Sequence, residues 1–203
     1  MIRAFWVLIS YLLGSIPAAL IAGRWMRGLD LREFGSGNLG ATNVYRVLGL
    51  KAALAVFAFD VLKGLVPVLL FPRLTPGVPS MLTPLLYGVA AIVGHIRPIY
   101  LRGQGGGKGV ATATGVFFAL APVPMILAVS VWIAVFALTR FVSLASMFAA
   151  GALPAAVAIW YGSSTWLFAG AAAVSLFVAW THRKNIERLS LGTEPRIARR
   201  GLR

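Results

Sequence analysis

The residues best suited to bind a charged group lie in a glycine-rich segment near the middle of the sequence. Four of the five residues from 105 to 109 are glycine, and the fifth is Lys108. Glycines let backbone N–H groups approach an anion closely, and a lysine at the start of a helix adds a positive charge. Because glycine is entropically costly to order, a flexible linker is the less favoured interpretation. We therefore expect Gly106, Gly107 and Lys108 to bind phosphate.

The same segment is similar to a Walker A loop, but it departs from that pattern at two positions. Arg102 stands where the first glycine belongs, and Gly109 stands where a serine or threonine would hold magnesium. These departures argue against a nucleoside triphosphatase, although they leave the phosphate-binding chemistry of the loop intact.

An earlier segment, residues 35–46, is also rich in glycine, hydroxyl and amide side chains. Its glycines match the spacing G-x-G-x-x-G, but an apolar stretch rather than a strand precedes them, and Asp60, at the spacing of the acidic partner, lies in another apolar stretch. A dinucleotide site is therefore rejected. The segment suits an anion site and, equally, a tight turn that caps the next helix. Its candidate binding residues are Ser36, Gly37, Asn38, Thr42, Asn43 and Arg46.

Isolated polar residues occur inside or at the ends of apolar stretches. Asp60 and Lys63 are one helical turn apart, and ionisable groups in a membrane usually face the bundle interior. Because no further acidic residues continue through the membrane, the spacing favours a buried ion pair over a proton path. His95, at the end of another apolar stretch, is expected to make a structural hydrogen bond.

The last third of the chain adds a second group of candidates. Arg140 is interpreted as a topology anchor, and Ser143 as a helix cap or a ligand-binding hydroxyl. His182 and Asn185 are three residues apart and would share one face of a helix. The alternative for this basic tail is contact with anionic lipid.

The composition shows which elements must position these residues. Hydrophobic residues make up 59% of the 203 residues and charged residues only 12%, against about 25% charged in a soluble domain. A bilayer must therefore surround most of the chain. The absence of cysteine excludes thiolate nucleophiles and zinc–sulfur sites. Seven stretches approach the length of a membrane span, and they are Phe5–Gly23, Leu50–Phe71, Leu82–Ile96, Val110–Ala121, Pro124–Thr139, Leu144–Tyr161 and Trp166–Thr181.

The distribution of basic residues predicts the orientation of these spans. Most of the 19 lysines and arginines follow the first, third, fifth and seventh stretches, and basic residues collect in cytoplasmic loops. We therefore predict an all-α polytopic membrane protein with seven transmembrane helices, the N-terminus outside and the C-terminus cytoplasmic.

The net charge of the chain is +14. The basic residues that produce it lie between apolar segments, which does not favour nucleic acid as a partner. The short outer loops leave no room for an outer domain, so residues 1–203 are expected to form a single domain.

Taken together, the polar segments resemble the bacterial acyl-phosphate:glycerol-3-phosphate acyltransferase family (PlsY). The similarity covers nearly the whole chain and lies in five segments in family order, Gly35-Ser36-Gly37-Asn38-x-Gly40-Ala41-Thr42-Asn43-x-x-Arg46, Asp60-x-x-Lys63-Gly64-x-x-Pro67, Gly94-His95-x-x-Pro98-x-x-Leu101 with Gly106-Gly107-Lys108-Gly109-Val110-Ala111-Thr112, Arg140-Phe141-Val142-Ser143-Leu144, and His182-x-x-Asn185-Ile186-x-Arg188-Leu189-x-x-Gly192-x-Glu194. The stretch Gly103-Gln104-Gly105 departs from the family pattern, which is one residue shorter there and contains an aromatic residue.

The resemblance implies an enzyme of the bacterial inner membrane, with its active site facing the cytoplasm. It implies transfer of an acyl group from acyl phosphate to glycerol 3-phosphate, giving 1-acylglycerol 3-phosphate and phosphate, the first step of phospholipid synthesis. No cofactor and no metal ion are expected to be needed for this reaction. Membrane lipid is expected to surround the chain. The sequence leaves the oligomeric state and the acyl chain-length preference open.

On this basis we assign expected roles to the candidate residues. Lys108, His182 and Asn185 are expected to be catalytic, with either His182 or a substrate phosphate as the base. The expected substrate-binding set is Ser36, Gly37, Asn38, Thr42, Asn43, Arg46, Gly106, Gly107, Lys108 and Ser143, and the expected supporting set is Asp60, Lys63, Arg140 and Glu194. The alternative function is a small transporter of phosphorylated anions, which should show repeats and broken helices.

Overall fold

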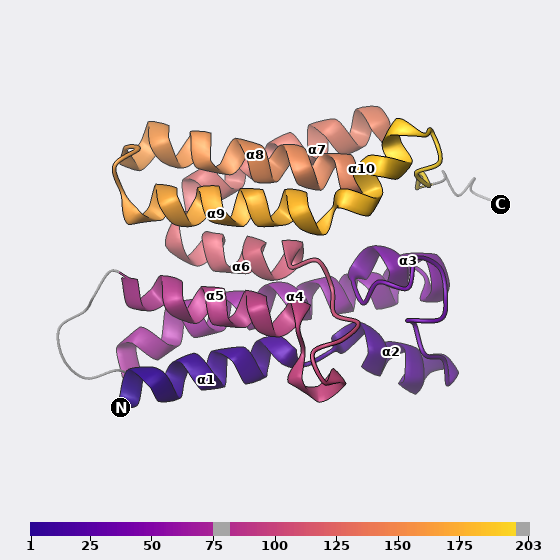
Figure 1. The fold of residues 1–203 in the computed structure, drawn as a ribbon, viewed down its shortest axis with the longest axis horizontal. Helices are drawn as coiled ribbons and strands as arrows, with labels where there is room; N and C mark the ends of the chain where they lie inside the picture. Colours follow the sequence, from indigo (N-terminus) through magenta and orange to yellow (C-terminus); the bar gives the residue numbers. More distant parts are fainter. Residues whose placement is uncertain (75–81, 198–203) are drawn as a thin grey trace. The chain divides into compact units, whose positions relative to one another are not determined.

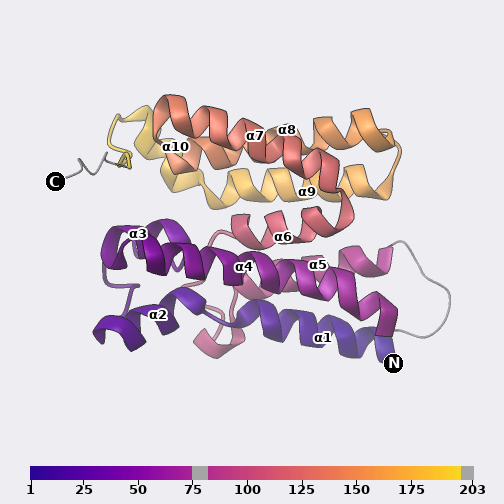
Figure 2. The same ribbon diagram turned by 180° about the vertical axis from the view of Figure 1, so that it is seen from behind.

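The computed structural model describes residues 1–74 and 82–197, and within these ranges all regular structure is helical. The chain divides into two compact units, Met1–Leu120 and Ala121–Arg203 (Figure 1, Figure 2). The predicted outer loop Pro72–Met81 lies mostly outside the described residues, as do Arg199, Arg200 and Arg203 of the predicted basic tail. The expectation of a single domain stays a prediction.

The first unit contains six α-helices and two short 3-10 helices within the described residues. They are α1 (Ile2–Ser15), α2 (Ala18–Arg27), α3 (Ala41–Leu48), α4 (Leu50–Leu70), η1 (Phe71–Leu74), α5 (Leu82–Ile96), η2 (Ile99–Leu101) and α6 (Val110–Leu120). The predicted bounds of the second, third and fourth spans agree with α4, α5 and α6 to within one residue.

The predicted first span, Phe5–Gly23, is wrong as a continuous helix, because the chain leaves the helical path between α1 and α2. Pro17 has no N–H to donate, and a residue before proline favours extended backbone. Ile16 accordingly has φ −61° and ψ 114°, and Pro17 has φ −86° and ψ 72°. The ammonium of Lys63 on α4 donates to the Ile16 carbonyl over 3.0 Å, so the break is held by a second helix.

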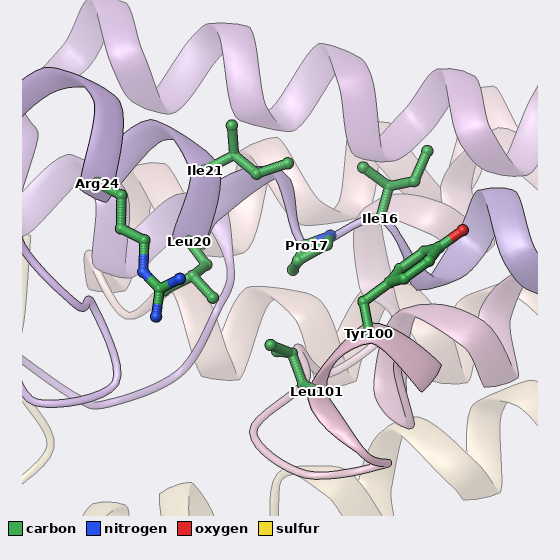
Figure 3. A pocket seen from close by; sticks show the side chains of 7 residues that line it. All are labelled: Ile16, Pro17, Leu20, Ile21, Arg24, Tyr100 and Leu101. Carbon is green, nitrogen blue, oxygen red and sulfur yellow. The ribbon is translucent and has the colours of Figure 1, made fainter.

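A cavity of about 370 Å³ lies beside this break. Its lining is mainly apolar and consists of Ile16, Pro17, Leu20, Ile21, Arg24, Tyr100 and Leu101 (Figure 3). The cavity is thus lined by the break and by η2, which belongs to the segment that leads into the glycine-rich loop.

Helix α3 was not predicted, since the sequence analysis treated residues 35–46 as a loop. The helix begins after Gly40 and ends at Gly49, which has φ 95°. Val44 of α3 is fully buried with Leu31 and Leu39 of the preceding loop, in one core cluster with residues of α2 and α4. Burial of this small apolar face stabilises a helix of eight residues that would be marginal in isolation.

Glycines bring α4 and α6 into backbone contact. A Cβ added at Gly64 would collide with the carbonyl oxygen of Thr112, and one added at Gly115 would collide with that of Val61. Small residues at such crossings let membrane helices approach closely. This contact positions the N-terminus of α6, where the glycine-rich loop ends.

The second unit consists of α7 (Pro122–Thr139), α8 (Val142–Tyr161), α9 (Trp166–Thr181) and α10 (Arg183–Ser190) within the described residues. The first three agree with the last three predicted spans to within two residues. Arg140, with φ 61°, makes the turn between α7 and α8. Thr165 caps α9 by accepting a hydrogen bond from the backbone N–H of Phe168 over 3.2 Å.

Among the described residues, five segments are long and apolar enough to cross a membrane. They are Ile2–Arg27, Leu50–Leu74, Leu82–Leu101, Pro122–Thr139 and Val142–Tyr161. The shorter apolar helices Val110–Leu120 and Trp166–Thr181 correspond to the fourth and seventh predicted spans. The described part of the chain is therefore all-helical with several candidate membrane spans, and the count of seven stays a prediction.

Candidate functional site

The two predicted phosphate-binding loops lie at the same end of the first unit. In Figures 1 and 2, α2, α3 and the loop between α5 and α6 lie away from the end of the unit that carries Met1. The loops also approach one another directly, since a Cβ added at Gly105 would lie 2.9 Å from Cδ of Arg32. The first unit thus brings both glycine-rich segments into one region.

A charged cluster fixes the start of the first loop. Arg32 donates from Nη2 and Nε to the two carboxylate oxygens of Asp30, over 2.6 and 2.9 Å, and Arg24 lies 3.4 Å from the same carboxylate. The hydrogen bond from the Arg32 side chain is the main cause that holds the pKa of Asp30 well below its usual value. Asp30 therefore remains ionised and balances two of the cations at this end.

The side chain of Asn43 is held by hydrogen bonds to the backbone of the first loop. Its Oδ1 accepts the Ser36 N–H over 2.8 Å, and its Nδ2 donates to the carbonyls of Leu31 and Phe34 over 3.1 and 3.0 Å. The side chain is only 1% exposed, so its polar atoms are directed at the loop backbone. These hydrogen bonds give Asn43 a scaffolding role, in which it shapes the loop around Ser36, and its predicted substrate contact stays a prediction.

Of the other candidates of the first loop, Ser36, Gly37, Asn38 and Thr42 lie before or at the start of α3, and Arg46 lies in its last turn. Ser36 and Arg46 are exposed, whereas Gly37, Asn38 and Thr42 are half-buried. Gly40 precedes α3 and supplies no capping side chain, and the first N–H groups of any helix lack acceptors within it. The helix that follows, α4, is capped by Gly49, so the alternative that this segment caps the next predicted span is wrong.

The second loop folds back on the end of α5. The Gly107 N–H donates to the His95 carbonyl over 3.1 Å, and Arg97 donates from Nη1 to the Gly103 carbonyl over 3.2 Å. Arg102, Gly103 and Gly105 all have positive φ. This left-handed turn accommodates the stretch that departs from the family pattern.

Gly106 and Gly107 are glycines because the loop backbone is pressed against α5. An added Cβ would collide with the Ile96 carbonyl at Gly106 and with Nε2 of His95 at Gly107. Lys108, half-buried, follows immediately, and α6 begins at Val110. The loop therefore delivers a lysine and the N-terminal amides of α6 to one place, an arrangement suited to an anion.

In the second unit, the carboxylate of Glu194 organises the predicted residues. Oε1 accepts hydrogen bonds from Ser143 Oγ and Asn185 Nδ2, both over 2.6 Å, and Oε2 accepts from Arg188 Nε over 2.7 Å. Burial raises the pKa of Glu194, but the hydrogen bonds from Ser143, Asn185 and Arg188 outweigh it and leave the pKa below its ordinary value. Glu194 therefore holds Ser143 of α8 and Asn185 of α10 in fixed positions.

The hydrogen bond of His182 defines its tautomer. Nδ1 lies 2.8 Å from the Val178 carbonyl oxygen, which can only accept, so Nδ1 carries the proton. In the neutral ring, Nε2 then holds the lone pair that a general base needs. His182 and Asn185 stand on the same short stretch, His182 at the junction of α9 and α10 and Asn185 in α10.

Arg140 contributes through its backbone. Its carbonyl accepts the Ile197 N–H over 3.0 Å, and the guanidinium of Arg196 lies 4.9 Å from the ring centroid of Phe141. The α7–α8 turn therefore anchors the tail that carries Glu194. The supporting role expected for Arg140 stays a prediction.

The predicted residues thus form two sets, one in each unit. The first unit contains Ser36, Asn38, Thr42, Arg46, Asp60, Lys63 and Lys108, and the second contains Arg140, Ser143, His182, Asn185 and Glu194.

The sequence analysis missed two supporting residues. Arg188 was quoted only within a motif, although its spacing to Glu194 suits an ion pair, and His95 was interpreted in isolation. Across residues 1–74 and 82–197, no group of three or more His, Cys, Asp or Glu residues could hold a metal ion.

Comparison with known proteins gives consistent results. The sequence pattern of the family described as glycerol-3-phosphate acyltransferase matches residues 4–192. Proteins of that name are similar to the chain in Synechococcus sp. strain CC9902, with 47% identity over 95% of this chain and 94% of the relative, and in Bacillus subtilis strain 168, with 41% identity over 97% and 98%.

A solved structure is similar as well. The crystal structure of PlsY, an integral membrane glycerol 3-phosphate acyltransferase, in its glycerol 3-phosphate form has a TM-score of 0.85 and 38% identity. It covers 97% of this chain and 96% of that one. The lysophosphatidic acid form of PlsY gives the same TM-score at 37% identity.

Proposed function

The chain belongs to the glycerol-3-phosphate acyltransferase family and is an integral membrane enzyme that acylates glycerol 3-phosphate, and we propose that its acyl donor is an acyl phosphate. The observation that carries acylation of glycerol 3-phosphate is the similarity over 97% of the chain to PlsY in its glycerol 3-phosphate form, and the donor is proposed from the resemblance of the five polar segments to the acyl-phosphate-dependent family. We further propose that the reaction takes place at the cytoplasmic face of the bacterial inner membrane.

The proposed donor matches the residues available for chemistry. An acyl phosphate is a mixed anhydride with a good leaving group, so the reaction needs no covalent nucleophile, and the chain has no cysteine. The main requirements are positioning of two phosphorylated substrates and stabilisation of their negative charge. Glycine-rich loops with nearby cations supply both.

In this proposal the first unit binds phosphate groups. Lys108 and the amides at the start of α6 form one binding place, and Ser36, Arg46 and the start of α3 form the other. The supporting observations are the direct approach of Gly105 to Arg32 and the loop geometry imposed by Asn43. Gly37, Asn38, Thr42, Gly106 and Gly107 shape these places and contribute backbone or side-chain donors.

The second unit then acts on the hydroxyl group of glycerol 3-phosphate. The hydroxyl oxygen attacks the carbonyl carbon of the acyl phosphate, the bond from that carbon to the phosphate oxygen breaks, and phosphate leaves with the electron pair. The hydroxyl proton passes to Nε2 of His182 or to a phosphate oxygen of a substrate. Asn185 and Ser143, held by Glu194, orient the reacting groups.

The proposed topology has seven spans, an outer N-terminus and a cytoplasmic C-terminus. It is supported by the position of most basic residues in alternate connecting segments. The short helices Val110–Leu120 and Trp166–Thr181 complete the count, and tilting or local thinning of the bilayer would accommodate their length.

A reaction with purified protein tests the function. The protein in detergent is mixed with an acyl phosphate and glycerol 3-phosphate, and lysophosphatidic acid and phosphate are measured. We expect both products in equal amounts, and we expect acyl-CoA to give none. Formation of no ester from acyl phosphate would contradict the proposed donor.

The transporter alternative predicts a different result, namely phosphate flux across liposomes without ester formation. Broken helices occur in transporters, where unwound carbonyls coordinate the transported ion. In this chain the Ile16 carbonyl at the break accepts from Lys63 instead. That contact favours a structural role for the break.

A further inference from the structure

Three ionisable side chains form a buried cluster in the first unit. Asp60, Lys63 and His95 are 2%, 6% and 7% exposed. Lys63 Nζ lies 2.7 Å from Asp60 Oδ1, and His95 Nδ1 lies 3.5 Å from the same oxygen. The predicted ion pair of Asp60 and Lys63 is therefore confirmed, and His95 of α5 joins it.

Two members of the cluster, Lys63 and His95, also contact other parts of the unit. Lys63 Nζ donates to the Ile16 carbonyl at the break between α1 and α2. His95 accepts the Gly107 N–H at its backbone carbonyl, and its ring packs so closely on Gly107 that a Cβ there would collide with Nε2. The cluster thus connects the broken helix, α4, α5 and the glycine-rich loop.

Burying these groups is energetically unfavourable unless they are well paired, and apolar side chains often stabilise a fold equally well. A role in packing alone therefore explains the cluster poorly. A proton path does not explain it either, because within residues 1–74 and 82–197 no other acidic side chain lies in a candidate span. The contacts point instead to the loop that the cluster holds.

We infer that Asp60, Lys63 and His95 are positioning residues that fix the glycine-rich loop and so set the place of Lys108 for phosphate binding. The carboxylate of Asp60 lies 3.5 Å from Nδ1 of His95 and orients the imidazole by electrostatic attraction. The oriented ring supports Gly107, one residue before Lys108. Lys63 neutralises Asp60 and holds the break in the first helix at a fixed distance from α4. The inference rests on the proposed role of this loop in binding a substrate phosphate.

Two substitutions of His95 separate its two contacts. His95→Asn keeps a side-chain N–H near the position of Nδ1 and removes the atoms that face Gly107. His95→Gln places its amide near the position of Nε2 and removes the ring nitrogen that faces Asp60. We expect His95→Gln and Asp60→Asn to raise the KM of one phosphorylated substrate about tenfold, with the KM of the other unchanged. His95→Asn should raise the same KM by a similar factor, because it removes the ring atoms that support Gly107.

A double variant adds a test that does not depend on loss of structure. Gly107→Ala should raise the same KM, because its Cβ pushes the loop away from His95. Combining it with His95→Asn makes room for the methyl group, so the double variant should recover at least part of the lost affinity. Failure of His95→Asn to improve Gly107→Ala would overturn the inference.

Ser146→Ala is the matched control for loss of a buried polar contact. Ser146 is 4% exposed and accepts a hydrogen bond from Trp132 Nε1 over 3.2 Å, in the second unit. It should lower thermal stability without changing either KM. If His95→Gln and Asp60→Asn behave in the same way, their role is structural and the inference is wrong.

The outcomes also separate the inference from the proposed function. A high KM in Lys108→Ala together with a normal KM in both His95→Gln and Asp60→Asn would overturn the inference alone. Normal KM values in Lys108→Ala and Gly107→Ala would remove the phosphate role of the loop, and the inference with it.

Discussion

At the scale of single residues, Lys108 carries the largest share of the proposed chemistry. Lys108→Ala should lower kcat/KM at least about a hundredfold, because it removes a cation from the place where phosphate charge is stabilised. The measurement is steady-state turnover of purified protein with both substrates. Lys51→Ala, which removes an exposed lysine at the start of α4, is the control and should retain activity. Near-normal turnover of Lys108→Ala would contradict the phosphate-binding role.

His182 allows the two candidate bases to be distinguished. His182→Asn keeps an N–H donor for the Val178 carbonyl and removes Nε2, so a histidine base predicts a fall in kcat of about 10²–10⁴-fold. The fall of kcat on the acidic side of the pH profile should disappear as well. If instead kcat falls less than about tenfold and that acidic limb persists, the base is a substrate phosphate, whose second pKa lies near 6.

The sequence predicted residue types better than residue roles. Asp60 and Lys63 were paired correctly because i, i+3 spacing on a helix fixes their proximity. His95 was not connected to them because it lies on α5, and contact between two helices depends on packing. The hydrogen bonds of the Asn43 amide with Leu31, Phe34 and Ser36 could not be predicted, because only the folded loop shows them.

At the scale of elements, the tail and α10 are joined to α8 by Glu194. Because the pKa of Glu194 is lowered in the fold, its carboxylate stabilises the protein above the ordinary value of 4.5 and loses that effect as the pH falls through the lower, folded value. Glu194→Gln should therefore cost about 2 kcal/mol at neutral pH.

Thermal unfolding in detergent at several pH values checks this prediction. The difference between Glu194→Gln and the parent protein should narrow as the pH falls below 4.5. Glu187→Gln, an exposed glutamate of α10, should leave stability nearly unchanged. A difference that stays constant down to strongly acidic pH would show that the charge of Glu194 is not what stabilises this region.

The crossing of α4 and α6 is sensitive to a single methyl group. Gly64→Ala should destabilise the protein by about 1–3 kcal/mol, because its Cβ meets the Thr112 carbonyl. Gly151→Ala on α8 is the matched control, since an added Cβ there meets nothing within 4 Å. Thermal unfolding should give a lower midpoint for the first variant only, and equal midpoints would contradict the proposed close contact.

Helix bounds could be predicted well where an apolar stretch ends at polar or glycine residues, as for α5 and α9. The break at Pro17 could not, because prolines are tolerated inside membrane helices. Pro67 and Pro154 lie within α4 and α8, which remain helical. Unlike these two prolines, Pro17 lies at a break that is held by the hydrogen bond from Lys63 to the Ile16 carbonyl. The sequence alone does not show this contact. Helix α3 was missed because tertiary burial, rather than propensity, stabilises so short a helix.

At the scale of the whole molecule, the apolar composition identified a helical membrane protein before any contact was known. The expected catalytic residues are divided between Met1–Leu120 and Ala121–Arg203. The proposed reaction nevertheless requires the loop of Lys108 in the first unit and His182 in the second to act on the same substrates. This requirement is the central claim of the account.

Labelling of single cysteines tests that claim most directly, and the chain has no cysteine that must first be removed. Gln104→Cys marks the glycine-rich loop, Lys184→Cys marks the His182 region, and Ser163→Cys marks the turn between α8 and α9, all at exposed positions. A membrane-impermeant maleimide is applied to intact cells and to inverted vesicles. We predict that residues 104 and 184 react only in inverted vesicles and residue 163 only in cells. Reaction of 104 and 184 from opposite sides of the membrane would contradict a shared site.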